Sequence, residues 1–297
     1  MKWLETSVTV DCEAAEAVAE VLSRYAPHGV AIEAGPDGGR IGPVTVRAYA
    51  PADDSEELRA HKRRIEEALW HLGQIWPIPT PTFQPVEEKD WAEAWKAQLS
   101  VLHIGERIVI RPSWLEHKKR RGDIVIQLDP GMAFGTGLHP TTQLCLETLE
   151  STVETGMNVL DVGTGTGILA IAAAKLGAAH VAAVDSDRVA FKTARENVAL
   201  NAVQGVVTTT CGSLEDTTGS YDLVVVNILA RVIVEMVHNG LGARIKPGGK
   251  VIAAGIILDQ ESEVKAAMER KGLALIDRRQ RDDWVCLVAN SPQNEPA

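Results

Sequence analysis

The segment Val159–Gly167, with the sequence VLDVGTGTG, constrains the fold most, because a short apolar run leads directly into a glycine-rich loop. A buried parallel strand is a short, continuous apolar run, and residues 158–162 fit that pattern. Residues 168–175, ILAIAAAK, predict a helix that follows at once. A strand, a glycine turn and a helix together predict one unit of a doubly wound α/β sheet.

The glycine spacing separates two classes of ligand. Gly163, Gly165 and Gly167 remove Cβ atoms where the backbone must turn sharply and approach a ligand. The dinucleotide fingerprint requires glycine at its first, third and sixth positions, and the sixth position here is Ile168. Asp161 would repel a pyrophosphate but accept hydrogen bonds from the ammonium group of an amino acid. The loop therefore favours S-adenosylmethionine (SAM) over NAD.

Two later strand ends carry polar side chains to the same expected edge. The apolar run 180–184 ends at Asp185, about twenty residues beyond the first glycine, where an acid reaches ribose hydroxyls. The run Leu223–Val226 ends at Asn227, whose amide oxygen can accept a hydrogen bond from a substrate amine. A glycine turn alone, or a strand-end asparagine alone, is common in α/β proteins. The combination predicts a methyl-donor site.

A second glycine-rich segment, Leu128–Thr142, precedes another predicted helix and is expected to close over the cofactor. Phe134 is expected to stack on adenine or to cover the pocket. Thr141 or Thr142 either binds the methionine end of SAM or caps the helix, and the sequence leaves both roles open. His139 is expected to be a hydrogen-bonding loop residue.

Methyl transfer from a sulfonium needs a neutral nitrogen held in line, about 3 Å from the methyl group. A lysine amine has a pKa near 10.4 in water, and an apolar cleft beside a positive charge lowers that pKa. A strong catalytic base is therefore not required. We assign Asn227 the role of orienting the substrate amine and identify no base.

Residues 1–85 predict a small separate domain that recognises the substrate. Its pattern β-α-β-β-α-β is typical of the ferredoxin-like α+β fold, which often serves recognition. Strands are expected at 3–10, 29–33, 44–50 and within 74–83, and helices at 13–25 and from residue 53 or 55. Residues 86–100 predict a linker helix with Trp91 and Trp95 on one face, a spacing typical of packing.

Residues 101–297 predict the catalytic domain, a doubly wound, Rossmann-like sheet. The last two strands, 272–277 and 284–288, are too close for a crossover helix and predict an antiparallel hairpin at the sheet edge. The other strands are expected at 107–110, 124–128, 158–162, 180–184, 206–210, 223–226 and 251–254.

Charge and composition restrict the partners. A net charge of −10 argues against a surface that follows nucleic-acid phosphates and favours a basic protein partner. The basic run His117–Arg121 lies between two apolar runs and is expected to be a solvated loop. The four cysteines form no C-x-x-C pair, so neither a metal site nor a disulfide framework is predicted. No apolar run is long enough for a membrane span or signal peptide, so a cytoplasmic location is expected.

Several separate motifs resemble the bacterial PrmA family, in that family's order. They are Lys89-Asp-Trp-x-x-x-Trp95, Arg111-Pro-Ser-Trp114, the segment 128–137, His139-Pro-Thr-Thr142 and Asn227-Ile-Leu-Ala230. The resemblance covers nearly the whole chain. It implies a SAM-dependent methyltransferase that modifies lysine side chains and the N-terminal amine of ribosomal protein eleven of the large subunit.

By motif position, the resemblance implies SAM contacts at Thr142, Gly163, Asp185 and Asn227. The same motifs add Phe134 and neighbouring glycines such as Gly165 to the expected contacts, and the residue-based argument adds Thr141. Two other hypotheses stay open. The enzyme would methylate another amine, or the chain would be a ribosome-associated module that binds SAM without turnover.

Overall fold

The computed structural model describes residues 2–23, 25–26, 30–33, 43–51, 56–73, 77–87, 100–128 and 137–293. The chain divides into two compact units, Met1–Leu99 and Ser100–Ala297. Parts of two predicted features lie outside the described residues: 129–136 of the second glycine-rich segment, which include Phe134, and 88–99 of the linker helix predicted at 86–100, which include Trp91 and Trp95.

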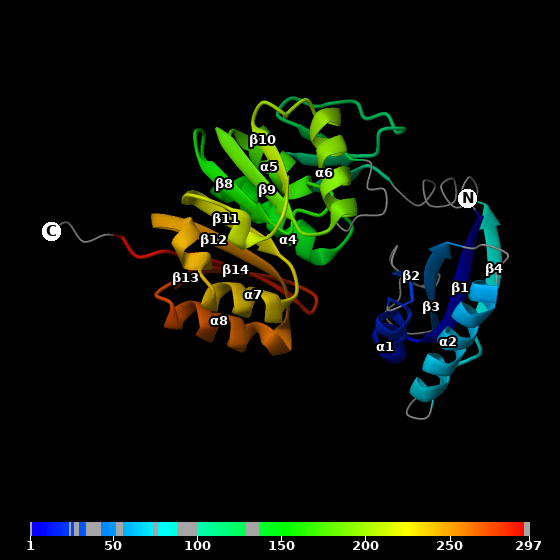
Figure 1. Ribbon diagram of the computed structural model, residues 1–297. Helices are drawn as coiled ribbons and strands as arrows, with labels where there is room; N and C mark the ends of the chain where they lie inside the picture. The colour runs from blue at the N-terminus through cyan, green and yellow to red at the C-terminus, as the bar shows by residue number, and fades with distance from the viewer. Residues whose placement is uncertain are drawn as a thin grey trace. The chain divides into compact units, whose positions relative to one another are not determined.

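The N-terminal unit is a four-stranded antiparallel sheet with the order β2-β3-β1-β4, and both of its helices pack on one face (Figure 1). That topology confirms the predicted ferredoxin-like α+β fold. Alternating residues such as Val8, Val10, Val44 and Val46 face the helices and are buried. The elements are β1 (Lys2–Asp11), α1 (Cys12–Ser23), β2 (Val30–Glu33), β3 (Pro43–Pro51), α2 (Glu56–Leu72) and β4 (Thr82–Glu87).

The last strand of this unit lies later than the sequence predicted, so the range 74–83 was wrong. β4 covers Thr82–Glu87 and therefore crosses the predicted domain boundary at residue 85. The prolines between 77 and 81 lack the N–H groups that a ladder needs, whereas Pro85 is tolerated because β4 is an edge strand.

The C-terminal unit contains a seven-stranded sheet with the order β10-β9-β8-β11-β12-β14-β13. Its first five strands are parallel, and β14 is antiparallel to both of its neighbours. The strands are β8 (Asn158–Val162), β9 (His180–Asp185), β10 (Val207–Cys211), β11 (Tyr221–Asn227), β12 (Ile245–Ile257), β13 (Ala274–Arg281) and β14 (Trp284–Asn290). The predicted doubly wound sheet and the antiparallel hairpin at its edge are confirmed, with β13 as the outermost strand.

Helices cover both faces of this sheet (Figure 1). One core joins the sheet to α4 and α5, and the other joins it to α7 and α8. Fully buried runs such as Leu223–Val226 explain why the central strands lack polar alternation. The helices are α4 (Pro140–Thr152), α5 (Ile168–Leu176), α6 (Arg188–Leu200), α7 (Ala230–His238) and α8 (Glu261–Arg270), with short 3₁₀ turns at Leu214–Asp216, Leu241–Arg244 and Leu258–Gln260.

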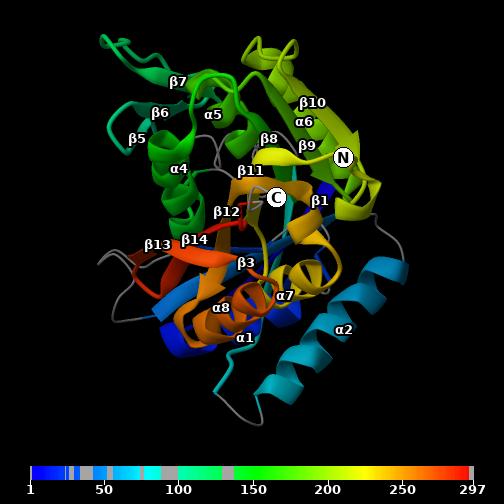
Figure 2. The same cartoon turned by 90° about the vertical axis from the view of Figure 1, so that its left-hand side faces the viewer.

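A small sheet of β5 (Leu102–Ile104), β6 (Ile108–Arg111) and β7 (Ile124–Gln127) lies beside α4 and α5 (Figure 2). The sequence predicted β6 and β7 but not the three-residue β5. Residues 118–121 of the basic run are exposed in the β6–β7 loop, as expected of a solvated loop.

Gly255 allows β12 to pass close to the end of β11. Its φ of +84° is left-handed, and a Cβ there would overlap the carbonyl oxygen of Ile228. The register with β14 also shifts between Ala253 and Ile256. The close approach fixes the backbone immediately after Asn227.

We predict that Gly255→Ala lowers the free energy of unfolding by at least about 2 kcal/mol, because a left-handed alanine is strained and its Cβ meets backbone. Urea unfolding measures the change. Gly205→Ala is the matched control, since a Cβ at that position would meet no atom within 4 Å and its φ is not left-handed. Equal midpoints for the two variants would contradict the prediction.

Candidate functional site

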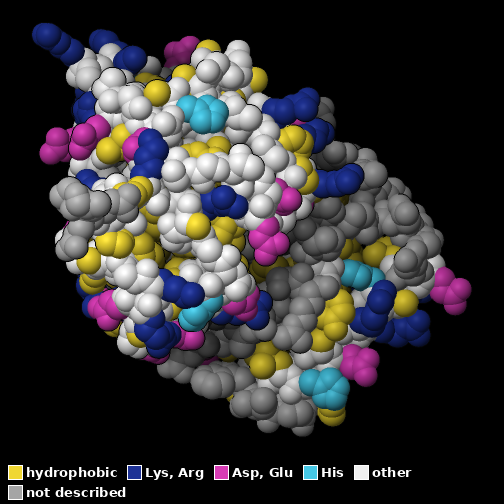
Figure 3. All heavy atoms as spheres, turned by 60° about the vertical axis from the view of Figure 1, so that its left-hand side comes forward, with side chains coloured by type: hydrophobic (Ala, Val, Ile, Leu, Met, Phe, Trp, Pro, Cys, Tyr) yellow, Lys and Arg dark blue, Asp and Glu magenta, His cyan; other side chains and the backbone are white. Residues whose placement is uncertain are grey.

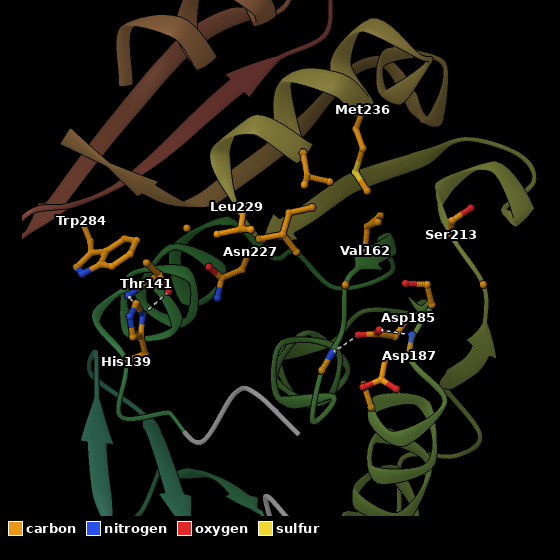
Figure 4. Close-up of a pocket in the computed structure, with 18 residues that line it drawn as sticks. His139, Thr141, Val162, Asp185, Asp187, Ser213, Asn227, Leu229, Met236 and Trp284 are labelled. Carbon is orange, nitrogen blue, oxygen red and sulfur yellow. Dashed lines mark hydrogen bonds between the residues drawn. The ribbon is translucent and has the colours of Figure 1, made fainter. Parts of the chain in front are cut away.

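A cavity of about 610 Å³ opens at the carboxyl edge of the parallel strands (Figure 4). This is the edge at which open α/β sheets bind their ligands. Five neighbouring strands contribute to its lining at or near their carboxyl ends, through Gly163, Asp185, Gly212, Asn227 and Gly255.

The glycine loop turns tightly beneath this cavity. Gly163 and Gly165 have φ values of +73° and +56°, which explains why glycine is needed at both positions. The amide of Gly163 donates to the carbonyl oxygen of Val184 at 2.9 Å, which ties the loop to β9. A Cβ on Gly163 would lie 2.6 Å from Cγ2 of Ile228. Both glycines line the cavity, as their predicted role requires.

Asp185 is held by two backbone amides. Its Oδ2 accepts from the amide of Gly165 at 2.9 Å, and its Oδ1 accepts from the amide of Asp187 at 3.0 Å. Each carboxylate oxygen can accept a further hydrogen bond. Asp187 caps α6 by accepting from the amide of Val189 at 2.9 Å. Asp185, the residue predicted to bind ribose, therefore lines the cavity with its carboxylate held in a fixed orientation.

Asp161 does not line the cavity in the described part of the chain. It is 1% exposed, and its Oδ2 accepts from Oγ1 of Thr164 at 2.6 Å and from the amide of Ala170 at 3.2 Å. Burial raises the pKa of Asp161 to about 7. Its hydrogen bonds link the glycine loop to the start of α5. The expected contact of Asp161 with the ammonium group of a ligand stays a prediction.

The two threonines differ in what they contact. His139 is the N-cap of α4, because its Nδ1 accepts from the amide of Thr141 at 3.3 Å, so the alternative of a threonine cap was wrong. Thr141 lines the cavity. Thr142 is buried, and its Oγ1 accepts a long hydrogen bond, 3.4 Å, from Nδ2 of Asn227. That bond orients the amide of Asn227.

Asn227 offers an acceptor that no described residue satisfies. Its Oδ1 is buried and has no hydrogen bond to the described residues, although the residue lines the cavity. An unpaired buried carbonyl oxygen costs about 1–3 kcal/mol, so a ligand N–H that pairs with it gains correspondingly. This geometry suits the predicted role of Asn227 in holding an amine.

The cavity has a negative electrostatic character. Asp185 and Asp187 line it, and no lysine or arginine does so among the described residues. Burial lowers the pKa of His139, which keeps its imidazole neutral near pH 7. Such a wall stabilises a cation and repels a pyrophosphate.

Sequence reasoning missed the apolar wall, the polar residues Ser186, Asp187 and Ser213, and the aromatic ring of Trp284. Leu229, Val232 and Met236 line the cavity from α7 and from the turn before it. Ser213 follows the end of β10, and the strand-end argument applied to Asp185 would have found it. Trp284 begins β14, and only the antiparallel direction of that strand brings it to this edge.

A family model described as "Ribosomal protein L11 methyltransferase (PrmA)" matches residues 2–292. The chain belongs to the PrmA family. The resemblance inferred from the motifs is therefore confirmed.

PrmA relatives match over their full lengths. The protein named ribosomal protein L11 methyltransferase from Chloroflexus aurantiacus is 45% identical over 327 residues, which cover 98% of this chain and 98% of the relative. The relative of the same name from Herpetosiphon aurantiacus is 41% identical, with 98% and 100% covered. The crystal structure of a ribosomal protein L11 methylase from Lactobacillus delbrueckii subsp. bulgaricus is 33% identical, with a TM-score of 0.62, and covers 66% of this chain and 100% of its own.

None of the described helices is both long and apolar enough to cross a membrane. Within the described ranges, no group of three or more His, Cys, Asp or Glu side chains has an arrangement that would hold a metal ion.

Asp161 should make stability depend on pH. Its folded pKa of about 7 lies above the ordinary value of 3.8, so the folded state binds the proton more tightly. The free energy of unfolding should therefore fall as pH rises between these values, by at most about 1.4 kcal/mol per pH unit. Urea unfolding of wild type and Asp161→Asn at several pH values measures this contribution. The difference between the two proteins should change with pH across that window, and a constant difference would contradict the assignment.

Proposed function

We propose that this PrmA-family protein transfers methyl groups from SAM to lysine side chains, and to the N-terminal amine, of ribosomal protein L11. The observation that carries the proposal is the cavity in which Asp185 and the unpaired Oδ1 of Asn227 line the carboxyl edge of one sheet. The names of the full-length relatives support the choice of substrate. The proposal includes a cytoplasmic location.

The described residues fit SAM. The donor is a cation, and the cavity wall carries carboxylates without lysine or arginine among the described lining residues. Asp185 would accept hydrogen bonds from the ribose hydroxyls of SAM. The loop at Gly163 and Gly165 has no side chains and leaves room for the methionine end of SAM. Thr141, Thr142 and Phe134 complete the proposed contacts. When bound, SAM supplies an electrophilic methyl group on a positively charged sulfur.

Asn227 would orient the acceptor. Its Oδ1 accepts one N–H of the neutral amine, which directs the nitrogen lone pair, and Thr142 holds the amide through the 3.4 Å contact. Alignment and exclusion of water account for the rate enhancement without a dedicated base.

The N-terminal unit offers a docking hollow for a basic protein. A cavity of about 450 Å³ lies between α2 and the proline-rich segment before β4. It combines an apolar lining with acids: Glu66, Glu67, Leu69, Trp70, Ile78, Pro79, Thr80 and Pro81. Trp70 is 61% exposed. A lysine-rich segment complements such a surface, since its stem packs on the ring while its charge faces the carboxylates.

The two alternative functions would use the same cavity but differ in whether, and to what, a methyl group is transferred. Another amine substrate would use the same Asn227 acceptor, whereas a module without turnover would bind SAM and transfer nothing. On the face that Figure 3 draws, Lys and Arg side chains lie among Asp and Glu side chains instead of forming a stripe, which does not favour a nucleic-acid substrate.

Incubation of purified L11 with this protein and SAM should add mass in methyl increments on lysines or the N-terminus, as measured by mass spectrometry. Asp185→Ala should weaken SAM binding roughly 10- to 100-fold, because it removes hydrogen bonds to a charged acceptor. Asp259→Ala, an exposed acid outside the cavity, is the matched control. SAM binding without any mass gain on L11 would contradict the proposal.

The double variant Glu66→Ala with Trp70→Ala should raise KM for L11 about tenfold and leave kcat and SAM affinity unchanged, because neither residue lines the catalytic cavity. Steady-state kinetics with L11 measure this. Arg63→Ala on the same helix, outside the hollow, is the control. An unchanged KM would exclude the hollow as the docking site.

A further inference from the structure

The two ends of the catalytic cavity differ in chemistry (Figure 4). One end carries the carboxylates of Asp185 and Asp187. The other end carries the amide of Asn227 and two aromatic rings, those of His139 and Trp284. If the ribose binds at Asp185, the opposite end is left for the methyl group and its acceptor.

Strand direction places Trp284 at the acceptor end. β14 is antiparallel to β12, so its first residue pairs with Ile257, the last residue of β12. β12 is parallel to β11, which ends at Asn227, and therefore finishes at the same edge. The indole reaches the cavity because the hairpin reverses the chain at this point.

His139 and Trp284 form an edge-to-face pair, with ring centroids 4.7 Å apart and planes at 69°. Nδ1 of His139 is occupied by Thr141: it accepts from the amide of Thr141 at 3.3 Å and lies 2.7 Å from Oγ1 of the same residue. This nitrogen therefore does not present a free base for the amine. The pair instead forms an uncharged aromatic wall.

We propose that Trp284 binds the amine after it has been methylated, and so determines how many methyl groups each amine receives. This inference rests on the proposed function. It assigns Trp284 a specificity role in the later transfers, beyond the orienting role of Asn227.

The chemistry of successive transfers supports this assignment. The lone pair of the neutral amine forms the N–C bond, the C–S bonding pair stays on sulfur as a neutral thioether, and the amine becomes an ammonium. The ammonium must release a proton to water before the next transfer. Each added methyl removes one N–H that Oδ1 of Asn227 would accept. Attraction between the cation and an aromatic ring persists, so the importance of Trp284 increases with every methyl group.

The test compares Trp284→Leu, which keeps an apolar side chain, with Trp284→Phe, which keeps a ring. Arg281→Ala is the matched control, because Arg281 pairs with Trp284 across the hairpin and binds Glu147 but does not line the cavity. Mass spectrometry of L11, at equal total methyl incorporation, gives the share of each methylation state. Calorimetry with S-adenosylhomocysteine present gives the affinity for L11 whose lysines have been dimethylated by reductive methylation.

Trp284→Leu should bind dimethylated L11 roughly tenfold more weakly, and its products should shift towards monomethylated sites. Trp284→Phe should keep an affinity for dimethylated L11 and a product distribution closer to those of wild type. Arg281→Ala should match wild type in both quantities, and all variants should bind SAM as wild type does. An unchanged product distribution and affinity in Trp284→Leu would overturn the role of Trp284. So would an equal loss in Arg281→Ala, which would indicate a structural effect of the hairpin. Wild-type protein that adds no methyl group to L11 would overturn the proposed function and this inference together.

Discussion

The parallel register of β9, β8, β11 and β12 is the constraint on which the site depends. Val162 pairs with Val184 on one side and with Val226 on the other, and Asn227 pairs with Ala254. The residues that follow these pairs therefore reach the sheet edge together. A slip of one residue would turn every side chain of a strand to the opposite face and would move the strand-end residues away from this common edge.

The carboxyl edge of the sheet brings several acidic side chains close together, and a cationic ligand would reduce the repulsion between them. Asp185 and Asp187 face a cavity without a lysine or arginine among its described lining residues, and Asp161 lies buried nearby with its pKa raised to about 7. Asn227 adds a carbonyl oxygen that has no hydrogen-bond partner among the described residues. The carboxylates and this carbonyl oxygen lower the stability of the protein without ligand. A positively charged methyl donor would offset the repulsion between the carboxylates, and an amine N–H would pair with the oxygen. This pattern agrees with the general concentration of strain and perturbed pKa values at functional sites.

The sequence predicted the features that depend on local pattern. Buried strands, the glycine loop and the strand-end residues Asp185 and Asn227 follow from apolar runs and their ends. Contacts between distant segments were not predictable in this way. The cap of α4 is His139 and not a threonine, because a cap depends on backbone direction at the helix start. Trp284 reaches the site only because β14 reverses its direction, and β4 was misplaced because proline tolerance depends on being at an edge.

The most direct test is a crystal structure of the protein with S-adenosylhomocysteine and a lysine-containing peptide of L11. The account predicts the ribose hydroxyls on Asp185, the lysine nitrogen within hydrogen-bonding distance of Oδ1 of Asn227, and its methylene stem against Trp284. A ligand bound in the reverse direction, or a lysine that enters from the Ser213 end, would contradict the arrangement of donor and acceptor proposed for this cavity.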